Sequence, residues 1–388
     1  MMKTKNKVIF PLISVMLAFF AMGFVDLVGI ATNYIKADFN LSDTMANLLP
    51  SMVFLWFLIF SIPTSVLMSK IGKRKTVMIS IAVTAVSLII PYIEYSFTSM
   101  LISFSLLGIG NALMQVSLNP LLTSIVSGDR LASSLTFGQF IKAIASFIAP
   151  LIAAWGVSQF DSWMLLFPIF FSISVVAVLL LGTTKIEETK DEGNNTTFGE
   201  CFSLMGDKVM LFFFIGIMCH VGIDVGTNVT APKLLMEHLE MPISEAGYAT
   251  SIYFMFRTIG CFLGAFILAF IPSKRIFAIS ILMMVAAAAG LFFSHDKIIM
   301  YTCIALIGLG NSNVFPIIMS QALLRNQDKQ NEVSGLLIMG LCGGALFPLL
   351  MGLATDMVGS QSGALIIIST CVAYLLFVIT QLKTIKTK

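Results

Sequence analysis

The stretch Leu107-Gly-Ile-Gly-Asn111 recurs 200 residues later as Ile307-Gly-Leu-Gly-Asn311. At the same offset, the basic turn Lys73-Arg-Lys75 falls opposite Ser273-Lys-Arg275. One match of this kind could arise by chance, but ordered matches on corresponding segments indicate an internal repeat. The sequence therefore predicts two homologous halves that share one fold.

The composition places both halves in a membrane. Of the 388 residues, 57% are hydrophobic and 11% are charged, whereas soluble proteins carry about 25% charged residues. A bilayer core takes roughly 20 apolar residues per helical span, so this chain supplies about a dozen spans. The apolar runs lie near 8–36, 43–69, 76–95, 97–126, 131–157 and 162–183, and then near 209–235, 243–271, 276–294, 297–324, 331–355 and 361–382. They predict an all-α membrane protein with 12 transmembrane helices in two pseudo-symmetric six-helix halves.

The domain boundaries follow from one long polar stretch, 184–207, whose Gly-Asn-Asn-Thr-Thr core is typical of a solvated linker. We expect an N-terminal six-helix bundle at 1–183, a cytoplasmic linker at 184–207 and a C-terminal six-helix bundle at 208–388. If the N-terminus is cytoplasmic, 18 Lys and Arg residues flank the spans on that side and three flank them outside. This bias predicts that both termini are cytoplasmic. The net charge of +3 is scattered, so nucleic acid is not an expected partner.

Five ionisable residues lie deep inside the predicted spans: Asp26, Lys142, His220, Asp224 and Arg257. Each costs at least about 2.5–3.5 kcal/mol at the bilayer centre unless it faces a partner or a wet cavity. In one explanation, Asp26 pairs with Lys142, and Asp224 with Arg257, as static clamps between helices. In the other, Asp26, Asp224 and His220 couple transport to protons, because movement of a nearby cation changes the affinity of a buried carboxyl group for a proton.

Polar residues form stripes along one face of several spans. His220, Asp224 and Asn228 are spaced i, i+4 and i+8. Similar stripes are formed by Asn111, Gln115 and Asn119; by Tyr253, Arg257 and Cys261; by Gln139, Lys142 and Ser146; and by Asp26 and Asn33. Five helices with a polar face predict a hydrophilic cavity between the two halves at mid-membrane.

Several motifs resemble those of one known family. They are Phe54-Leu-Trp-Phe-Leu-Ile-Phe-Ser-Ile-Pro63 with the loop Lys70-Ile-Gly-Lys-Arg-Lys75, Leu113-Met-Gln-Val-Ser-Leu-Asn-Pro120, His220-Val-Gly-Ile-Asp-Val225, Ser244-Glu-Ala-Gly-Tyr248, Asn311-Ser-Asn-Val-Phe-Pro316, Ser334-Gly-Leu-Leu337 and Gly343 to Asp356. Over nearly the whole chain, they resemble the fucose, glucose and galactose:cation symporter family of the major facilitator superfamily. The resemblance implies a major facilitator fold that imports a monosaccharide or sugar derivative by proton or sodium symport with alternating access. We expect a multi-pass monomer in the lipid bilayer of the bacterial inner membrane, without a cofactor or a metal.

The resemblance also implies roles for single residues. Gln115, Asn119 and Gln139 stand on sugar-contact positions of the family, and Asp224 stands where the family often has Glu. We expect substrate binding by Gln115, Asn119, Gln139, Lys142, Asn228, Arg257 and Asn311, and a gating loop at Gly72, Lys73 and Arg74. A stacking aromatic could be Trp56, Phe137, Phe140 or Tyr253.

The chain departs from the family's pattern at its charged positions. Asp26 lies about a turn before the family's acid, Lys142 replaces a usual Asn, and Arg257 lies one turn from a usual Arg that is Cys261 here. Because two cations could receive a carboxylate, an anionic sugar such as a sialic or uronic acid is an alternative substrate.

Other classes of protein fit the sequence less well. A drug or metabolite exporter of the same fold would suit a cavity rich in Met and Phe, but the amides on the polar faces argue against it. A membrane sensor would need a soluble domain. An enzyme is not expected, because the sequence has no nucleophile elbow, metal-ligand cluster or phosphate loop. The six cysteines show no paired spacing, so neither a disulfide framework nor a zinc site is expected.

Overall fold

The computed structural model describes residues 2–41, 45, 48–126, 128, 130–188, 196–241, 246 and 248–382, and the regular structure of these residues is helical. Within them, 12 segments are long and apolar enough to cross a membrane. They are Ile9–Thr32, Leu48–Ile71, Lys73–Ile93, Phe97–Thr123, Arg130–Phe160, Trp163–Thr183, Lys208–Leu239, Tyr248–Ile267, Ser273–Phe293, Lys297–Arg325, Gln327–Val358 and Ser362–Gln381. The predicted all-α architecture with 12 spans is confirmed.

Three of these spans are interrupted, which apolar length alone did not predict. Span 1 consists of α1 (Met2–Met22), a 3-10 turn η1 (Gly23–Asp26) and α2 (Leu27–Asp38). Span 10 is divided into α14 (Lys297–Asn311) and α15 (Val314–Arg325), and span 11 into η4 (Gln327–Lys329), α16 (Gln330–Met339), η5 (Gly340–Cys342) and α17 (Gly343–Val358). Each break lies at glycine or polar residues, where the helical backbone is least constrained.

The chain forms two compact units. Unit 1 comprises Met1–Ser127, Gly138–Ser203 and Asn326–Met339, and unit 2 comprises Gly128–Phe137, Leu204–Arg325 and Gly340–Lys388. Each unit therefore contains one short segment from the other half of the sequence.

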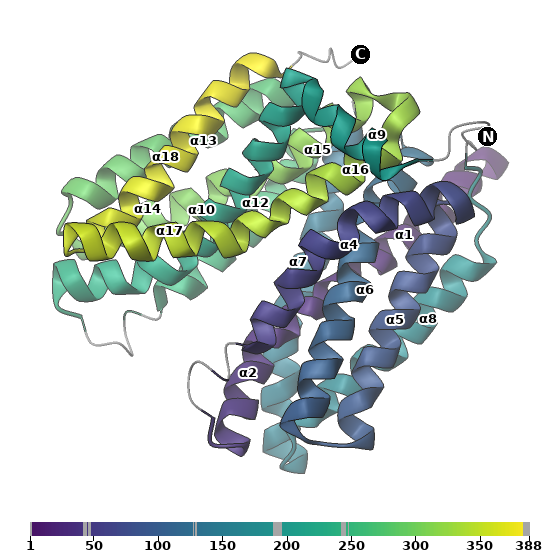
Figure 1. Ribbon diagram of the computed structural model, residues 1–388, viewed down its shortest axis with the longest axis horizontal. Helices are drawn as coiled ribbons and strands as arrows, with labels where there is room; N and C mark the ends of the chain where they lie inside the picture. The colour runs from purple at the N-terminus through teal and green to yellow at the C-terminus, as the bar shows by residue number, and fades with distance from the viewer. Residues whose placement is uncertain are drawn as a thin grey trace. The chain divides into compact units, whose positions relative to one another are not determined.

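In unit 1, α4 (Leu48–Ile71), α6 (Phe97–Thr123), α5 (Lys73–Ile93) and α8 (Leu166–Thr183) follow one another side by side (Figure 1). The remaining elements of this unit are the part of α7 (Arg130–Phe160) from Gly138 onward, η2 (Trp163–Leu165) and α9 (Phe198–Ser203). α16 packs against α4 and α6, so a segment of the second half completes the first bundle.

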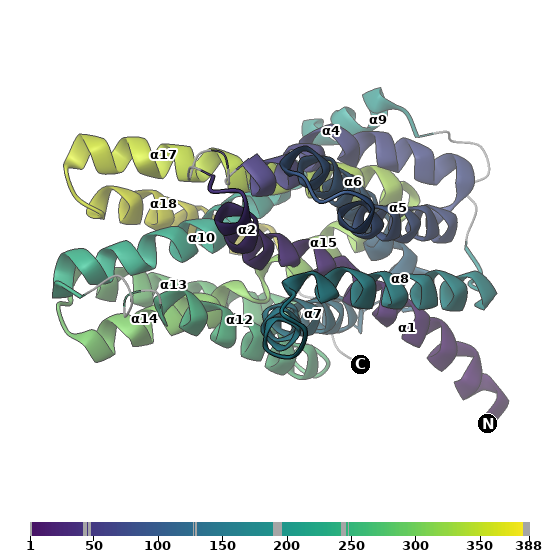
Figure 2. The same ribbon diagram turned by 90° about the horizontal axis from the view of Figure 1, so that it is seen from below.

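In unit 2, α10 (Lys208–Leu239) packs against α17 and α18 (Ser362–Val378), as Figure 2 shows. α14 packs against both α12 (Tyr248–Ile267) and α13 (Ser273–Phe293). Short 3-10 turns, η3 (Leu204–Gly206) and η6 (Ile379–Gln381), flank the first and last helices.

The internal repeat is visible in the helix boundaries and caps. α5 and α13 begin 200 residues apart, as do α6 and α14. The Ser96 side chain accepts a hydrogen bond from the Ser99 amide at 3.2 Å at the start of α6, and Asp296 accepts one from Ile299 at 3.0 Å at the start of α14. Such caps satisfy amides that a helix leaves unpaired at its first turn.

The repeated Gly-x-Gly motif allows close helix packing in both units. A β-carbon on Gly108 would lie 2.8 Å from the Val53 carbonyl oxygen, and one on Gly308 would lie 2.5 Å from that of Tyr253. Val53 and Tyr253 are themselves 200 residues apart. The motif that revealed the repeat is therefore the place where neighbouring backbones meet, as small residues allow inside membranes.

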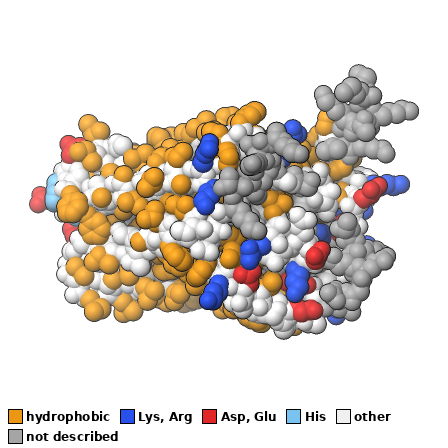
Figure 3. All heavy atoms as spheres, turned by 90° about the horizontal axis from the view of Figure 1, so that it is seen from above, with side chains coloured by type: hydrophobic (Ala, Val, Ile, Leu, Met, Phe, Trp, Pro, Cys, Tyr) orange, Lys and Arg blue, Asp and Glu red, His pale blue; other side chains and the backbone are white. Residues whose placement is uncertain are grey.

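The outer surface of the helices is apolar. Large hydrophobic side chains such as Met357 and Phe293 are 88% and 85% exposed, and hydrophobic side chains cover much of the face in Figure 3. A soluble monomer rarely exposes apolar patches on this scale. The protein is a multi-pass membrane protein whose outer face is suited to contact with lipid.

We predict that Gly308→Ala destabilises the protein by about 1–3 kcal/mol, because its methyl group would meet backbone atoms that cannot move aside. The matched control is Gly352→Ala in α17, where nothing lies within 4 Å of the added β-carbon. The melting temperature of the detergent-solubilised protein measures both effects. A Gly308→Ala protein as stable as the Gly352→Ala protein would contradict this account of the repeat.

Candidate substrate and coupling site

The break in span 1 is held by two neighbouring helices of unit 1. Asn111 of α6 donates a hydrogen bond from Nδ2 to the Met22 carbonyl at 2.7 Å, where α1 ends. Gly23 follows, and a β-carbon there would lie 2.5 Å from the Lys142 carbonyl oxygen of α7. The irregular backbone is thus satisfied within the bundle, as the apolar part of a bilayer requires.

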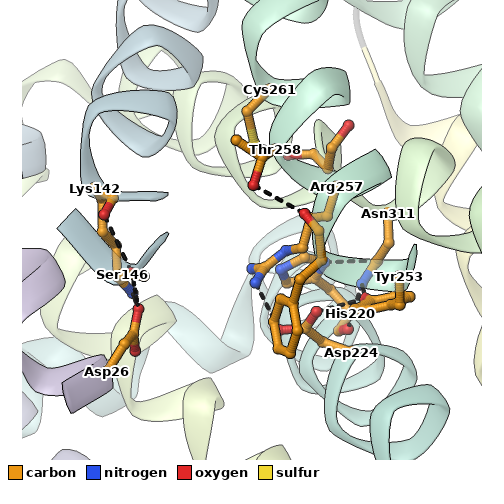
Figure 4. Close-up of polar contacts among 12 residues, drawn as sticks. Asp26, Lys142, Ser146, His220, Asp224, Tyr253, Arg257, Thr258, Cys261 and Asn311 are labelled. Atoms are coloured by element: carbon orange, nitrogen blue, oxygen red, sulfur yellow. Dashed lines mark hydrogen bonds and ion pairs between the residues drawn. The ribbon is translucent and has the colours of Figure 1, made fainter. Parts of the chain in front are cut away.

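This break carries Asp26 to its two partners on α7 (Figure 4). Ser146 donates its hydroxyl hydrogen to Asp26 Oδ2 at 2.5 Å, and Lys142 Nζ lies 3.9 Å from the same oxygen. The predicted pairing of Asp26 with Lys142 is present. Among the described residues, Asp26 Oδ1 has no hydrogen-bond partner, and the side chain is 44% exposed. One carboxylate oxygen of Asp26 is therefore available to a proton or a ligand.

The predicted amides of α6 form a chain along one face of that helix. Gln115 Nε2 donates to Asn111 Oδ1 at 2.9 Å, and Asn119 Nδ2 donates to the Gln115 carbonyl at 2.8 Å. All three side chains are buried. The i, i+4 spacing seen in the sequence thus links the Gln115 amide to that of Asn111, and the Asn119 amide to the main chain of Gln115.

Five buried polar atoms in unit 1 have no hydrogen-bond partner within the described structure. Two of them, Ser124 Oγ and Asn331 Oδ1, lie on residues that were not predicted as site residues. The other three are Asn119 Oδ1 on α6, Gln139 Nε2 on α7 and Trp56 Nε1 on α4. Buried polar groups are nearly always paired, so each such atom calls for an explanation. One acceptor and two donors suit a ligand rich in hydroxyl groups, since a hydroxyl both donates and accepts.

In unit 2, Asn311 of α14 joins two helices (Figure 4). Its Nδ2 donates to the His220 carbonyl and to the Tyr253 hydroxyl oxygen, each at 3.2 Å. Its Oδ1 lies 2.7 Å from His220 Nδ1. A carbonyl oxygen only accepts, so the amide nitrogen must face it. The Asn311 oxygen therefore accepts from His220, and His220 carries a proton on Nδ1.

The same network continues to a second ion pair. Tyr253 donates its hydroxyl hydrogen to Asp224 Oδ1 at 2.5 Å, and Arg257 Nη1 lies 3.2 Å from Asp224 Oδ2. The predicted pairing of Asp224 with Arg257 is present. Each oxygen of Asp224 therefore faces a donor. Asp224 is thus held from both sides, whereas Asp26 keeps one oxygen open.

The two acids occupy equivalent places in the repeat, which sequence reasoning missed. Asn111 bonds to the Met22 carbonyl and Asn311 to the His220 carbonyl, and an aspartate follows each carbonyl by four residues. The offset between the asparagines is 200, but that between the acids is 198. This slip of two residues hid the correspondence. Their cations come from different helices, Lys142 from α7 and Arg257 from α12.

The predicted gating loop contacts parts of the chain that sequence reasoning did not connect with it. Gly72 has φ 93°, in the region that favours glycine. The backbone amides of Lys73 and Arg74 donate to the two oxygens of Glu188 at 2.6 and 2.9 Å, and Lys73 Nζ donates to Gln330 Oε1 at 2.8 Å. The loop is thus bound to the linker and to α16 within unit 1. The one signal in the sequence for the contact between Glu188 and the start of α5 is the negative charge of Glu188, because a helix N-terminus attracts a negative charge.

The other predicted residues stand apart from these clusters or outside the described residues. Asn228 lies one turn beyond Asp224 on α10, and its carbonyl accepts from Thr250 at 3.2 Å. Cys261 donates to the Ser312 carbonyl at 3.5 Å. The Asn33 side chain and most of the Ser244-Glu-Ala-Gly-Tyr248 motif lie outside the described residues. In the described part of the chain, no group of three or more His, Cys, Asp or Glu residues could hold a metal ion.

Twelve apolar spans in two related bundles, with an ion pair and buried amides in each, are typical of a multi-pass membrane transporter. The chain belongs to the Major Facilitator Superfamily, whose family model matches residues 12–345 and 209–385. This membership confirms the predicted fold and identifies a transporter, not an enzyme.

Individual proteins and structures agree with the family assignment. The chain is 24% identical to a glucose/galactose transporter of Brucella abortus biovar 1 (strain 9-941) over 387 residues, covering 95% of this chain and 93% of that protein. A crystal structure of the transporter FucP in the outward conformation superposes with a TM-score of 0.85, at 17% identity over 97% of this chain and 100% of that one. The structure of the proton:xylose symporter XylE superposes with a TM-score of 0.75, at 14% identity, and the match covers 99% of this chain and 98% of that one.

We predict that Tyr253→Phe destabilises the protein by about 1–3 kcal/mol, because Asp224 Oδ1 loses its donor and the Asn311 amide loses an acceptor in a buried place. Tyr92→Phe is the matched control, since Tyr92 is 55% exposed. Melting temperatures in detergent measure the difference. Equal melting temperatures for the two variants would show that the network contributes nothing to stability.

Proposed function

We propose that the protein imports a neutral monosaccharide by proton symport across the inner membrane of a bacterium. The observation that supports a neutral substrate is the pairing of both interior cations with carboxylates of the same unit, while buried amide and indole groups remain open to hydroxyls. The Brucella abortus relative is named a glucose/galactose transporter, which agrees with a hexose as the substrate. We further propose that the protein is a monomer. We also propose that both termini lie in the cytoplasm, because the distribution of Lys and Arg favours that orientation.

The ion pairs argue against the alternative of an anionic sugar. A substrate carboxylate would have to displace Asp26 from Lys142 or Asp224 from Arg257, whose charged groups lie 3.9 and 3.2 Å apart. Removing one partner of such a pair leaves a charge without compensation in a poorly solvated place. A hexose can use the open atoms of Asn119, Gln139 and Trp56 without disturbing either pair.

Asp26 is the better candidate for the coupling proton. It is the more exposed of the two acids, at 44% against 18% for Asp224, and it keeps one oxygen open. A proton on Asp26 would remove its attraction for Lys142, and Asp26 lies at a break where span 1 can rearrange.

Alternating access would use the two sequence halves as moving bodies. We propose that 1–183 and 208–388 rock about the linker 184–207, and that the loop at Gly72, Lys73 and Arg74 acts as a gate. The gating role is supported by the hydrogen bond from Lys73 to Gln330, which belongs to the second half of the sequence. This bond has to break if the two halves separate at the end of the spans where the loop lies. Lys142, Asn228, Arg257 and Asn311 remain proposed substrate-binding residues, with Asp224 and His220 supporting the coupling network.

We predict that proteoliposomes containing this protein accumulate glucose or galactose when an inward proton gradient is imposed. A sodium gradient alone should produce only the slow equilibration seen without any gradient. Radiolabelled uptake of neutral hexoses and of sialic and uronic acids separates the two substrate classes. Accumulation of an acidic sugar, with none of any neutral hexose, would overturn the proposal in favour of the anionic alternative.

We predict that Asp26→Asn abolishes accumulation driven by the proton gradient but preserves exchange of labelled for unlabelled sugar, because exchange does not require the proton to leave. Asp161→Asn is the matched control: Asp161 is exposed and lies at φ 51°, which Asn adopts readily. Uptake and counterflow are measured in the same vesicles. Gradient-driven accumulation by Asp26→Asn at the level of the control would exclude Asp26 as the coupling site.

A further inference from the structure

Two of the six cysteines meet inside unit 2, although their spacing in the sequence gives no sign of a pair. Cys219 lies on α10 and Cys371 on α18, two helices that pack against each other, and the two thiol groups are close neighbours. The residues are 4% and 1% exposed. The thiols of Cys201 and Cys261 contact Ser65 and Ser312 instead. Cys219 and Cys371 thus form a buried dithiol between two packed helices.

The packing of α10 on α18 brings together the segments that carry these residues. Tyr374 of α18 donates its hydroxyl hydrogen to the Phe212 carbonyl of α10 at 3.2 Å. Farther along α10, a β-carbon on Gly226 would lie 3.4 Å from Ile368 Cγ1. The two helices are therefore antiparallel. Cys219 lies between Phe212 and Gly226, and Cys371 lies between Ile368 and Tyr374.

We propose that Cys219 and Cys371 form a binding site for a thiophilic centre that makes two bonds to sulfur, such as trivalent arsenic. Phenylarsine oxide shows how the atoms balance. Each thiol gives up its hydrogen, the arsenic forms one bond to each sulfur, and the arsenic oxygen leaves with the two hydrogens as water. Arsenic stays trivalent, so the reaction needs neither an oxidant nor a reductant.

The surroundings of the dithiol suit this chemistry. The product carries no charge, and an uncharged product avoids the cost of an ion in an apolar interior. Two neighbouring thiols held on packed helices have already lost much of the entropy that closing the arsenic ring would otherwise cost. The neighbouring residues Thr370 and Ala373 of α18 are exposed on the apolar outer surface, so an uncharged aromatic reagent can approach from the lipid.

Occupation of this site would affect α10 close to the coupling network. Cys219 is followed directly by His220, whose ring contacts Asn311. An arsenic bridge would fix α10 to α18 at this level. The site is separate from the open amides of unit 1, and its chemistry does not depend on which solute the protein carries.

The test uses the full-length protein in detergent with phenylarsine oxide as the probe. The expected result is an equimolar arsenic adduct by intact-mass spectrometry, with the Cys219 and Cys371 peptides bridged after digestion. Cys219→Ala and Cys371→Ala should each lose the adduct completely. Cys303→Ala, which removes another buried thiol, is the matched control and should retain it.

A second measurement keeps the proposal testable if a variant is less stable. A ligand that binds the folded state raises its melting temperature, so the probe should raise that of the wild-type and Cys303→Ala proteins but not that of Cys371→Ala. Treatment with a small dithiol should reverse the shift. An adduct that survives in the variant lacking both Cys219 and Cys371, or folded wild-type protein that takes up no arsenic, would overturn the assignment.

Discussion

Each helical unit depends on one asparagine that donates a hydrogen bond to a main-chain carbonyl of its first span. Asn111 satisfies the Met22 carbonyl in unit 1, and Asn311 satisfies the His220 carbonyl in unit 2. In the apolar part of a bilayer no water replaces a missing partner, so these bonds determine where irregular or polar backbone can occur. The aspartate that follows each carbonyl by four residues is placed by this contact.

Much of the fold could be predicted because the bilayer imposes it. Apolar length predicted the 12 spans, and the Gly-x-Gly repeat predicted the duplication, because close packing at Gly108 and Gly308 needs a residue without a side chain. Helical periodicity also predicted that Asn111, Gln115 and Asn119 share a face. These properties depend on one helix at a time, or on one neighbouring backbone, and the sequence encodes them directly.

The features that were missed depend on contacts between distant segments. Glu188 reaches the start of α5 from the linker, and Cys219 meets Cys371 across two helices far apart in the sequence. Apolar length could not reveal the turn at Gly23–Asp26, since a 3-10 turn and an α-helix contain the same residue types. The equivalence of Asp26 and Asp224 was hidden because the offset of the repeat changes by two residues between spans.

The two units use the same scaffold for different electrostatic purposes. In unit 2, an unbroken α10 presents Asp224 to Tyr253 and Arg257, and the buried Asn311 and His220 extend that network. In unit 1, a broken span presents Asp26 to a longer ion pair with Lys142, and the acid remains half exposed. A carboxyl group with a donor on each oxygen is held more firmly than one with an open oxygen. A duplicated protein can therefore hold one acid in a closed network and leave the equivalent acid partly open, so the symmetry of the fold does not require the two sites to be alike.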